Sequence, residues 1–121
     1  MKIWGSVNSG GQEAVTEYKI LAKNDHVSFV KFTPLTGRTH QIRVHAADGG
    51  HPILGDTLYG IKLIAKHKVK RMMLHAAQLQ FDHPISGEKI TITAELPHEF
   101  LNFMKNNTQF KKAISLYPND P

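Results

Sequence analysis

The sequence contains no cysteine, so disulfide bonds and thiolate metal sites are excluded. It also lacks an apolar run close to the roughly 18 residues that a membrane-spanning helix needs. The amino terminus, Met1 to Gly5, is not followed by the long apolar stretch of a signal peptide. These absences predict a soluble protein of the cytoplasm that has no membrane partner.

The 121 residues, of which 40% are hydrophobic, suffice for one globular domain with its own core. Lys and Arg number 15 against 10 Asp and Glu, which gives a formal net charge of +5. Two windows, 26–47 and 57–81, contain cations but no acidic residue. Such an excess favours a polyanion partner such as RNA, although a solvated basic surface has the same composition.

Apolar residues at every second position predict two β-hairpins. The first has strands at 15–23 and 27–34, joined at Asn24-Asp25-His26. The second has strands at 74–81 and 89–96, with Leu79 and Phe81 on the same side as Ile90 and Ile92. A Pro/Gly-containing turn at 82–87 joins these two strands.

Three segments are predicted to be helical. Thr39 is a suitable N-cap for a short helix that ends near Asp48, where Gly49 or Gly50 supplies the stop. The same segment also alternates like a strand, but the capping residues favour a helix. The other two are 61–73, where Lys62, Lys66 and Lys70 share one face, and a helix that begins at Pro97.

The expected organisation is one α+β unit. Residues 1–12 are rich in glycine and predict a flexible leader. Residues 13–114 form the folded part, and residues 115–121 predict a frayed tail.

The densest polar cluster begins at the entry of the first predicted helix. Arg38, Thr39 and His40 offer a guanidinium, a hydroxyl and backbone N–H groups to a phosphate. His40 and His45 are five residues apart, which fits no zinc pair, so no metal site is expected. A serine hydrolase is disfavoured because no Gly-x-Ser-x-Gly motif is present. Asp56 lies in a glycine-rich loop and is predicted to hold its turn through backbone N–H groups.

Several ordered segments resemble the carboxy-terminal motifs of the RluA-type RNA pseudouridine synthases. They are Leu-Thr-Gly-Arg-Thr-His-Gln-Ile-Arg-Val-His at 35–45, Gly-His-Pro-Ile-Leu-Gly-Asp at 50–56, Leu-Tyr-Gly at 58–60 and Leu-His-Ala at 74–76. The resemblance covers roughly residues 13 to 100, which is far more specific than one short motif.

The resemblance implies a part of the catalytic domain, with a mixed, largely antiparallel sheet and flanking helices. It implies an isomerase that converts uridine to pseudouridine in rRNA or tRNA without a cofactor or metal. The family's essential aspartate lies in a His-Arg-Leu-Asp segment, and this chain contains no Arg-Leu-Asp. We therefore expect the carboxy-terminal portion of a synthase, inactive alone, whose partner is the missing amino-terminal half.

Arg43 matches the family arginine that pairs with the catalytic aspartate. A guanidinium within a few ångströms lowers a carboxyl pKa by roughly 1–3 units and so keeps the acid ionised. Because that acid is expected from outside the chain, an internal acidic partner for Arg43, away from any open cleft, would count against this interpretation.

The resemblance places Arg38, Thr39 and His40 at the RNA pocket, whereas charge alone suggests RNA contacts for Lys66, Lys68, Lys70 and Arg71. Two other functions stay open. One is a non-catalytic RNA-binding module derived from the same family, and the other is a small structural domain. A sheet interrupted by truncation would leave an unpaired edge, which predicts a homodimer.

Overall fold

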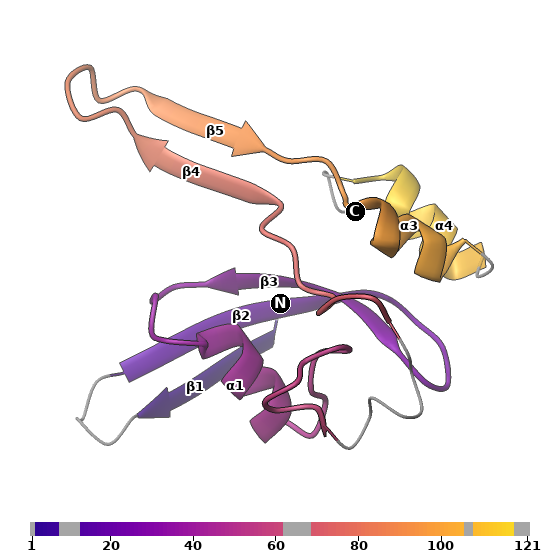
Figure 1. The fold of residues 1–121 in the computed structure, drawn as a ribbon. Coiled ribbons are helices and arrows are strands. Elements are labelled where there is room, and N and C mark those ends of the chain that lie inside the picture. Colours follow the sequence, from indigo (N-terminus) through magenta and orange to yellow (C-terminus); the bar gives the residue numbers. More distant parts are fainter. Residues whose placement is uncertain (1, 8–12, 62–68, 106–107, 118–121) are drawn as a thin grey trace. The chain divides into compact units, whose positions relative to one another are not determined.

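The computed structural model describes residues 2–7, 13–61, 69–105 and 108–117. It contains antiparallel sheets and helices, so the predicted α+β class is confirmed (Figure 1). No helix among these residues is long and apolar enough to cross a membrane. In chain order the elements are β1 (Lys2–Val7), β2 (Glu13–Lys23), β3 (Ser28–Pro34), α1 (Gln41–Asp48), β4 (Gln78–Asp82), β5 (Lys89–Thr93), α3 (His98–Met104) and α4 (Thr108–Ser115).

The chain divides into two compact units, Met1–Met73 and Leu74–Pro121. This differs from the single unit expected from the sequence. The reason is strand pairing: β1, β2 and β3 form one sheet, while β4 pairs with β5 in a separate sheet. Alternating apolar residues identify strands but do not reveal which strands share a sheet.

The first sheet has the order β1-β2-β3, with antiparallel neighbours. β1 pairs with the start of β2, from Lys2 opposite Tyr18 to Val7 opposite Glu13. The flexible leader predicted for residues 1–12 is therefore replaced by a strand at Lys2–Val7. Residues 1 and 8–12 lie outside the described residues. β2 supplies the backbone hydrogen-bond partners that order β1, and a glycine-rich local sequence does not reveal such a distant partner.

The β2–β3 hairpin is confirmed, with the turn where the sequence predicted it. The Asn24 side-chain oxygen accepts the backbone N–H groups of His26 and Val27 at 2.8 and 2.9 Å. The Asn24 N–H also donates to the carbonyl of Val27 at 3.0 Å. An asparagine that bonds its own turn in this way fixes where the two strands reverse.

The predicted helix is also confirmed as α1, but its first residue is capped differently. His40, not Thr39, occupies the N-cap, with a left-handed backbone (φ 51°) and no side-chain capping bond. The predicted glycine stop is present, since Gly50 has φ +84° and the Gly49 N–H donates to the His45 carbonyl at 3.0 Å. α1 packs against the three-stranded sheet (Figure 1).

The helix predicted at 61–73 falls mainly on residues 62–68, which lie outside the described residues. Residues 69–73 are described and are not helical. The Met73 N–H donates instead to the carbonyl of Leu54 at 2.8 Å.

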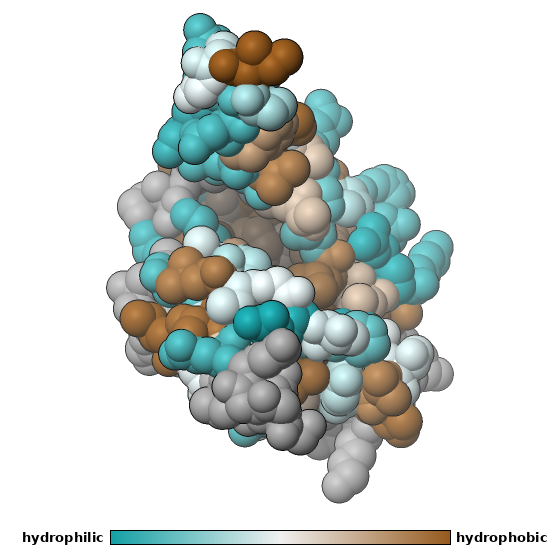
Figure 2. Space-filling model, turned by 90° about the vertical axis from the view of Figure 1, so that its left-hand side faces the viewer, coloured by the Kyte–Doolittle hydropathy of each residue, from teal (hydrophilic) through white to brown (hydrophobic). Residues whose placement is uncertain are grey.

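The second unit begins with the predicted β4–β5 hairpin. Its register places Leu79 opposite Ile92 and Phe81 opposite Ile90, as the alternation indicated. These side chains are not buried, however: Leu79 is 60% exposed and Ile92 is 54% exposed. Figure 2 shows hydrophobic residues at the molecular surface beside polar ones.

The two helices α3 and α4 carry the buried side chains of the second unit, Phe100, Met104 and Phe110. Pro97 is the N-cap of α3, so the helix begins at His98, one position after the start that the sequence predicted. Part of the predicted frayed tail is ordered, since the Tyr117 N–H donates to the carbonyl of Ile114 at 3.0 Å. Residues 118–121 lie outside the described part.

Candidate functional site

One face of α1 carries a buried polar network that joins the helix to β2. Gln41 and His45 are one turn apart, so they lie on the same face, and both are buried. The His45 ring nitrogen Nδ1 lies 2.7 Å from Oγ1 of Thr16, a fully buried residue. The Gln41 amide donates to the Val15 carbonyl at 2.8 Å and to Thr16 Oγ1 at 3.0 Å. These two motif residues therefore join the helix to β2.

The same glutamine also fixes the loop that precedes α1. Its side-chain oxygen accepts the Thr36 hydroxyl at 2.6 Å and the Arg38 N–H at 3.1 Å. Thr36 in turn accepts the Val15 N–H at 3.0 Å. Because the loop is bonded to both α1 and β2, the exposed Arg38 side chain starts from a fixed backbone. Its Nε donates to the Glu13 carbonyl at 3.3 Å.

Arg43 points away from this network and forms a bidentate ion pair with Asp56. Nε donates to Oδ2 at 2.9 Å and Nη2 donates to Oδ1 at 2.8 Å. Asp56 is fully buried, and the Arg43 side chain is 18% exposed. Two parallel N–H···O bonds fix the guanidinium in its own plane as well as in distance.

Asp56 also organises its loop, as predicted. Its Oδ1 accepts the backbone N–H groups of Leu58 and Tyr59, each at 3.0 Å. The hydrogen bond from Arg43 and those from the two backbone groups hold the pKa of Asp56 well below its usual range, against the opposing effect of burial. The same pair raises the pKa of Arg43. Both partners therefore stay charged across the physiological pH range.

A glycine lets this loop reach its position. Gly55 has φ +80°, and a Cβ at this residue would overlap the backbone of Arg71 and Met72. The Gly60 N–H donates to the Asp56 carbonyl at 2.9 Å, which closes the turn around the acid. The close backbone approach at Gly55 therefore fixes where Asp56 meets Arg43.

Tyr59 adds an aromatic face to the ion pair. The Arg43 Cζ lies 5.3 Å from the centroid of the Tyr59 ring, within the range of a cation–π interaction. His40 meets Tyr59 from the side, with Nδ1 3.3 Å from the hydroxyl and the ring centroids 6.0 Å apart at 80°. No role was predicted for Tyr59, because a separation of sixteen residues from Arg43 across a loop has no periodic signal.

The predicted RNA-binding residues fall into three groups. Arg38, Thr39 and His40 are exposed at the start of α1, close in sequence to Arg43. Lys70 and Arg71 are exposed in the segment after the undescribed residues, and the Arg71 Nε donates to the Met72 carbonyl at 3.1 Å. Lys66 and Lys68 lie outside the described residues. RNA contact by any of them stays a prediction.

Arg43 was expected to find its acid outside the chain, but the structure gives it an internal partner, Asp56. The structure therefore meets one part of the condition set against the isomerase interpretation, the internal acidic partner, and the family assignment must rest on other findings. A guanidinium has five N–H donors, and the two bonds to Asp56 leave three. Those three have no partner among the described residues.

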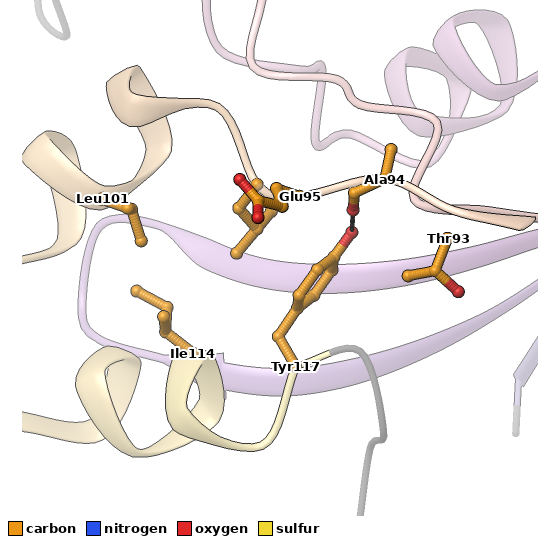
Figure 3. Close-up of a pocket in the computed structure, with 7 residues that line it drawn as sticks. Thr93, Ala94, Glu95, Leu101, Ile114 and Tyr117 are labelled. Atoms are coloured by element: carbon orange, nitrogen blue, oxygen red, sulfur yellow. Dashed lines mark hydrogen bonds between the residues drawn. The ribbon is translucent and has the colours of Figure 1, made fainter.

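The second unit contains a pocket of about 380 Å³ between the end of β5 and the two helices. Leu101 of α3 and Ile114 of α4 face it, and the Tyr117 hydroxyl donates to the Ala94 carbonyl at its side (Figure 3). Burial raises the pKa of Tyr117. The lining of the pocket contains one carboxylate, Glu95, and no basic side chain. Nor do the described residues of either unit contain a group of three His, Asp or Glu that could hold a metal ion.

Comparison with known proteins shows which proteins this chain is similar to. A family model described as RNA pseudouridylate synthase matches residues 3–48. Ribosomal large subunit pseudouridine synthase C of Yersinia pestis is 43% identical over 110 residues, which cover 84% of this chain and 34% of the relative. An uncharacterized RNA pseudouridine synthase of Bacillus subtilis, YhcT, is 45% identical over 103 residues, or 82% of this chain and 32% of the relative.

Solved structures agree with these relatives. Human RNA pseudouridylate synthase domain containing 1 superposes with a TM-score of 0.63 and 32% identity, over 93% of this chain and 51% of that chain. Human RNA pseudouridylate synthase domain containing 4 has a TM-score of 0.65 and 27% identity, over 81% and 44%.

The antiparallel sheets, the α1 motif and these superpositions define an α+β domain of the kind found in RNA-modifying proteins. Within that class, the chain belongs to the RluA-type RNA pseudouridine synthase family, as the motif resemblance implied. It spans about a third of the length of the curated relatives described above.

Proposed function

We propose that this chain contributes to the isomerisation of uridine to pseudouridine in RNA, with rRNA or tRNA as the substrate, in the cytoplasm and without a metal or cofactor. The observation that carries the proposal is the state of Arg43. A buried carboxylate binds one edge of its guanidinium, and the other three N–H donors have no partner among the residues that the structure describes.

Asp56 is not suited to be the reacting acid. It is fully buried, and it accepts two hydrogen bonds from Arg43 and one each from Leu58 and Tyr59. An acid held in this way neither approaches a ribose nor exchanges a proton readily. Its function is to orient Arg43.

The reacting aspartate is therefore assigned to a polypeptide segment that this chain does not contain, the His-Arg-Leu-Asp segment of the family. The free N–H edge of Arg43 would pair with that aspartate, lower its pKa and set its direction. The proposed partner is thus the amino-terminal part of a synthase, which completes the site.

RNA contact is proposed for the surface beside Arg43. Arg38, Thr39 and His40 are exposed there, and Lys66, Lys68, Lys70 and Arg71 would add positive charge for the backbone. A uridine reaches an enclosed site only by leaving its stack, at a cost of about a few kcal/mol. Phosphate contacts of this kind offset that cost.

The test is tritium release from RNA labelled at C5 of uridine. The chain alone is expected to give none, and addition of the amino-terminal two thirds of the Yersinia pestis relative is expected to restore turnover. Arg43→Ala should then reduce turnover at least a hundredfold while RNA affinity changes less than threefold. Arg38→Ala, in the loop before the helix that carries Arg43, is the matched control. It should weaken RNA binding and leave turnover at saturating RNA intact.

Turnover by the chain alone would contradict the proposed division of the site. A non-catalytic RNA-binding module is the alternative, and it is supported if RNA binds but complementation never yields turnover and Arg43→Ala weakens binding as Arg38→Ala does. If no RNA binds at low salt, a structural role is the remaining interpretation.

A homodimer through a sheet edge is also proposed. β1 and β3 are the outer strands of the three-stranded sheet. Among the described residues, β4 and β5 pair only with each other, and their hairpin has exposed apolar side chains. Open edges and apolar patches are the surfaces through which chains pair.

A further inference from the structure

Three side chains from two segments form a continuous line of contacts that ends at the ion pair. His40 lies at the N-terminal end of α1, Tyr59 lies in the loop after Asp56, and Arg43 lies inside α1. The His40 ring contacts the hydroxyl end of Tyr59, and the face of Tyr59 lies against the Arg43 guanidinium. All of these contacts lie within the first compact unit.

The backbone at His40 supports a specific role for this line. His40 is the one non-glycine residue with positive φ among the described residues. Left-handed backbone is unfavourable for residues with a Cβ, and it persists where the surroundings determine it, often at functional sites. His40 gives no side-chain cap to the helix in return. What it does make is the contact with Tyr59.

The two partners of Arg43 constrain it in complementary ways. Asp56 binds the Nε–Nη2 edge and therefore fixes the guanidinium within its plane. Tyr59 lies 5.3 Å from Cζ and limits tilting out of that plane. A donor group held in both directions presents its remaining N–H groups along one direction, which is the requirement for aligning a second acid.

We propose that Tyr59 is a positioning residue that fixes the plane of the Arg43 guanidinium, and that His40 holds the Tyr59 ring in place. The inference deepens the proposed function and rests on it for its catalytic consequence. The geometric part, Tyr59 acting on Arg43, concerns the free chain and is testable without RNA or any partner.

The first experiment follows the Arg43 side chain by nuclear magnetic resonance in the full chain. Tyr59→Leu removes the ring while Asp56 remains, so the hydrogen-exchange rate of the Arg43 Nε–H should rise at least tenfold. Tyr59→Phe keeps the ring and loses the hydroxyl, and His40→Ala removes the side chain that contacts this hydroxyl. Both substitutions should therefore raise the exchange rate only about two- to fivefold. Arg43→Lys identifies the signal.

Leu58→Ala is the matched control, because Leu58 is the neighbouring residue, bonds Asp56 through its backbone, and has a side chain that is 57% exposed. It should leave the Arg43 exchange rate within twofold of the native rate. If Tyr59→Leu also stays within twofold, the positioning role is overturned. Tyr59→Leu could speed exchange simply by unfolding the loop, and Tyr59→Phe tests this because it preserves the ring packing. If Arg43 Nε–H exchange in Tyr59→Phe is as fast as in Tyr59→Leu, a role for the ring face is contradicted.

The second experiment uses the complemented tritium-release assay. Tyr59→Leu should lower kcat about 10- to 100-fold with the KM for RNA within threefold, and Tyr59→Phe should recover most of the loss. If Tyr59→Leu keeps the native kcat in an assay where Arg43→Ala is inactive, the inference about Tyr59 is overturned while the proposed function stands. An inactive native mixture would instead count against the proposed function, while the exchange measurement still decides whether Tyr59 positions Arg43.

Discussion

At the scale of single residues, the carboxylate of Asp56 determines how Arg43 is presented. It accepts four hydrogen bonds, two from the guanidinium and two from its own loop. The loop and the arginine are therefore organised by the same two oxygen atoms. Loss of this one group would release Arg43 and loosen the turn together.

The first residue-scale prediction is a pH-dependent loss of stability in Asp56→Asn. The folded protein depresses the pKa of Asp56, so the ionised acid stabilises the fold above the ordinary aspartate pKa. That contribution is lost as the pH falls below about 4, toward the lower folded pKa. At pH 7 the substitution should reduce the free energy of unfolding by about 2 kcal/mol, since hydrogen bonds to charged groups contribute about 1.5–3 kcal/mol each.

The measurement is urea unfolding at pH 7 and pH 3, followed by the fluorescence of Trp4, the single tryptophan, in β1. The difference between native and variant protein should shrink at pH 3. Asp25→Asn, in the exposed β2–β3 turn, is the control and should change the free energy by less than about 0.5 kcal/mol at either pH. An equal difference at both pH values would rule out the charge of Asp56 as the cause.

Sequence reasoning was right about Asp56 as a turn residue and incomplete about Arg43. The turn role follows from local rules, because an aspartate among glycines bonds nearby N–H groups. The pair with Arg43 joins residues 43 and 56 across a loop, and only the three-dimensional path of that loop brings them together. The N-cap is His40 and not the predicted Thr39. The His40 ring contacts Tyr59, nineteen positions away, and local capping rules do not register such a contact.

At the scale of elements, α1 is joined to the three-stranded sheet by buried polar contacts. Gln41 joins the helix to Val15, Thr16 and Thr36. Without the amide these bonds are lost, although each group keeps one other partner: Thr16 contacts His45, Thr36 accepts the Val15 N–H and the Val15 carbonyl accepts the Leu35 N–H. The position of the helix, and so of Arg43, depends on this residue.

Gln41→Ala is expected to lower the free energy of unfolding by about 2–3 kcal/mol, because a buried amide loses four hydrogen bonds that contribute about 0.5–1.5 kcal/mol each. Thermal and urea unfolding would measure the loss. Gln78→Ala in β4 provides the comparison: Gln78 is exposed and its amide makes one long bond to Thr93. If the two substitutions proved equally mild, the network would not be what anchors α1.

The hairpins were predictable and β1 was not. In both hairpins the period-two pattern is flanked by turn residues, and these signals are local. β1 has Gly5 in its centre and glycines after it, which weaken a strand by themselves. It forms because the edge of β2 offers six partner positions, from Tyr18 to Glu13.

At the scale of the whole molecule, the apolar side of the β4–β5 hairpin is an exposed hydrophobic surface. Leu79 and Ile92 are 60% and 54% exposed, and Phe81 is 40% exposed. Exposed apolar groups on a two-stranded sheet with free edges favour association between chains. We therefore expect the proposed homodimer or larger species at high concentration.

Light scattering over a concentration series measures this association. Leu79→Glu should shift the protein toward monomer, because the charge lies on the apolar side of the hairpin. Gln80→Glu adds the same charge to the neighbouring residue on the opposite side, and association should persist. A native protein that stays monomeric throughout would disprove the proposed self-association.

The division into two units could not be predicted from the sequence. Both halves contain strands and helices of ordinary pattern, and no proline- or glycine-rich linker marks the boundary at 73–74. Family membership, in contrast, was accessible from the sequence, because four spaced motifs preserve both order and spacing, while the pairing that Arg43 makes required coordinates.

The backbone of His40 has a consequence for how this protein tolerates change. Glycine adopts φ near +51° freely, whereas a residue with a side chain gives up about 1 kcal/mol there. Heat-based screening of random variants would therefore enrich glycine at position 40 and discard the imidazole. Improved thermal tolerance would then come with a loosened Tyr59, so variants chosen for robustness should not be assumed to keep their chemistry.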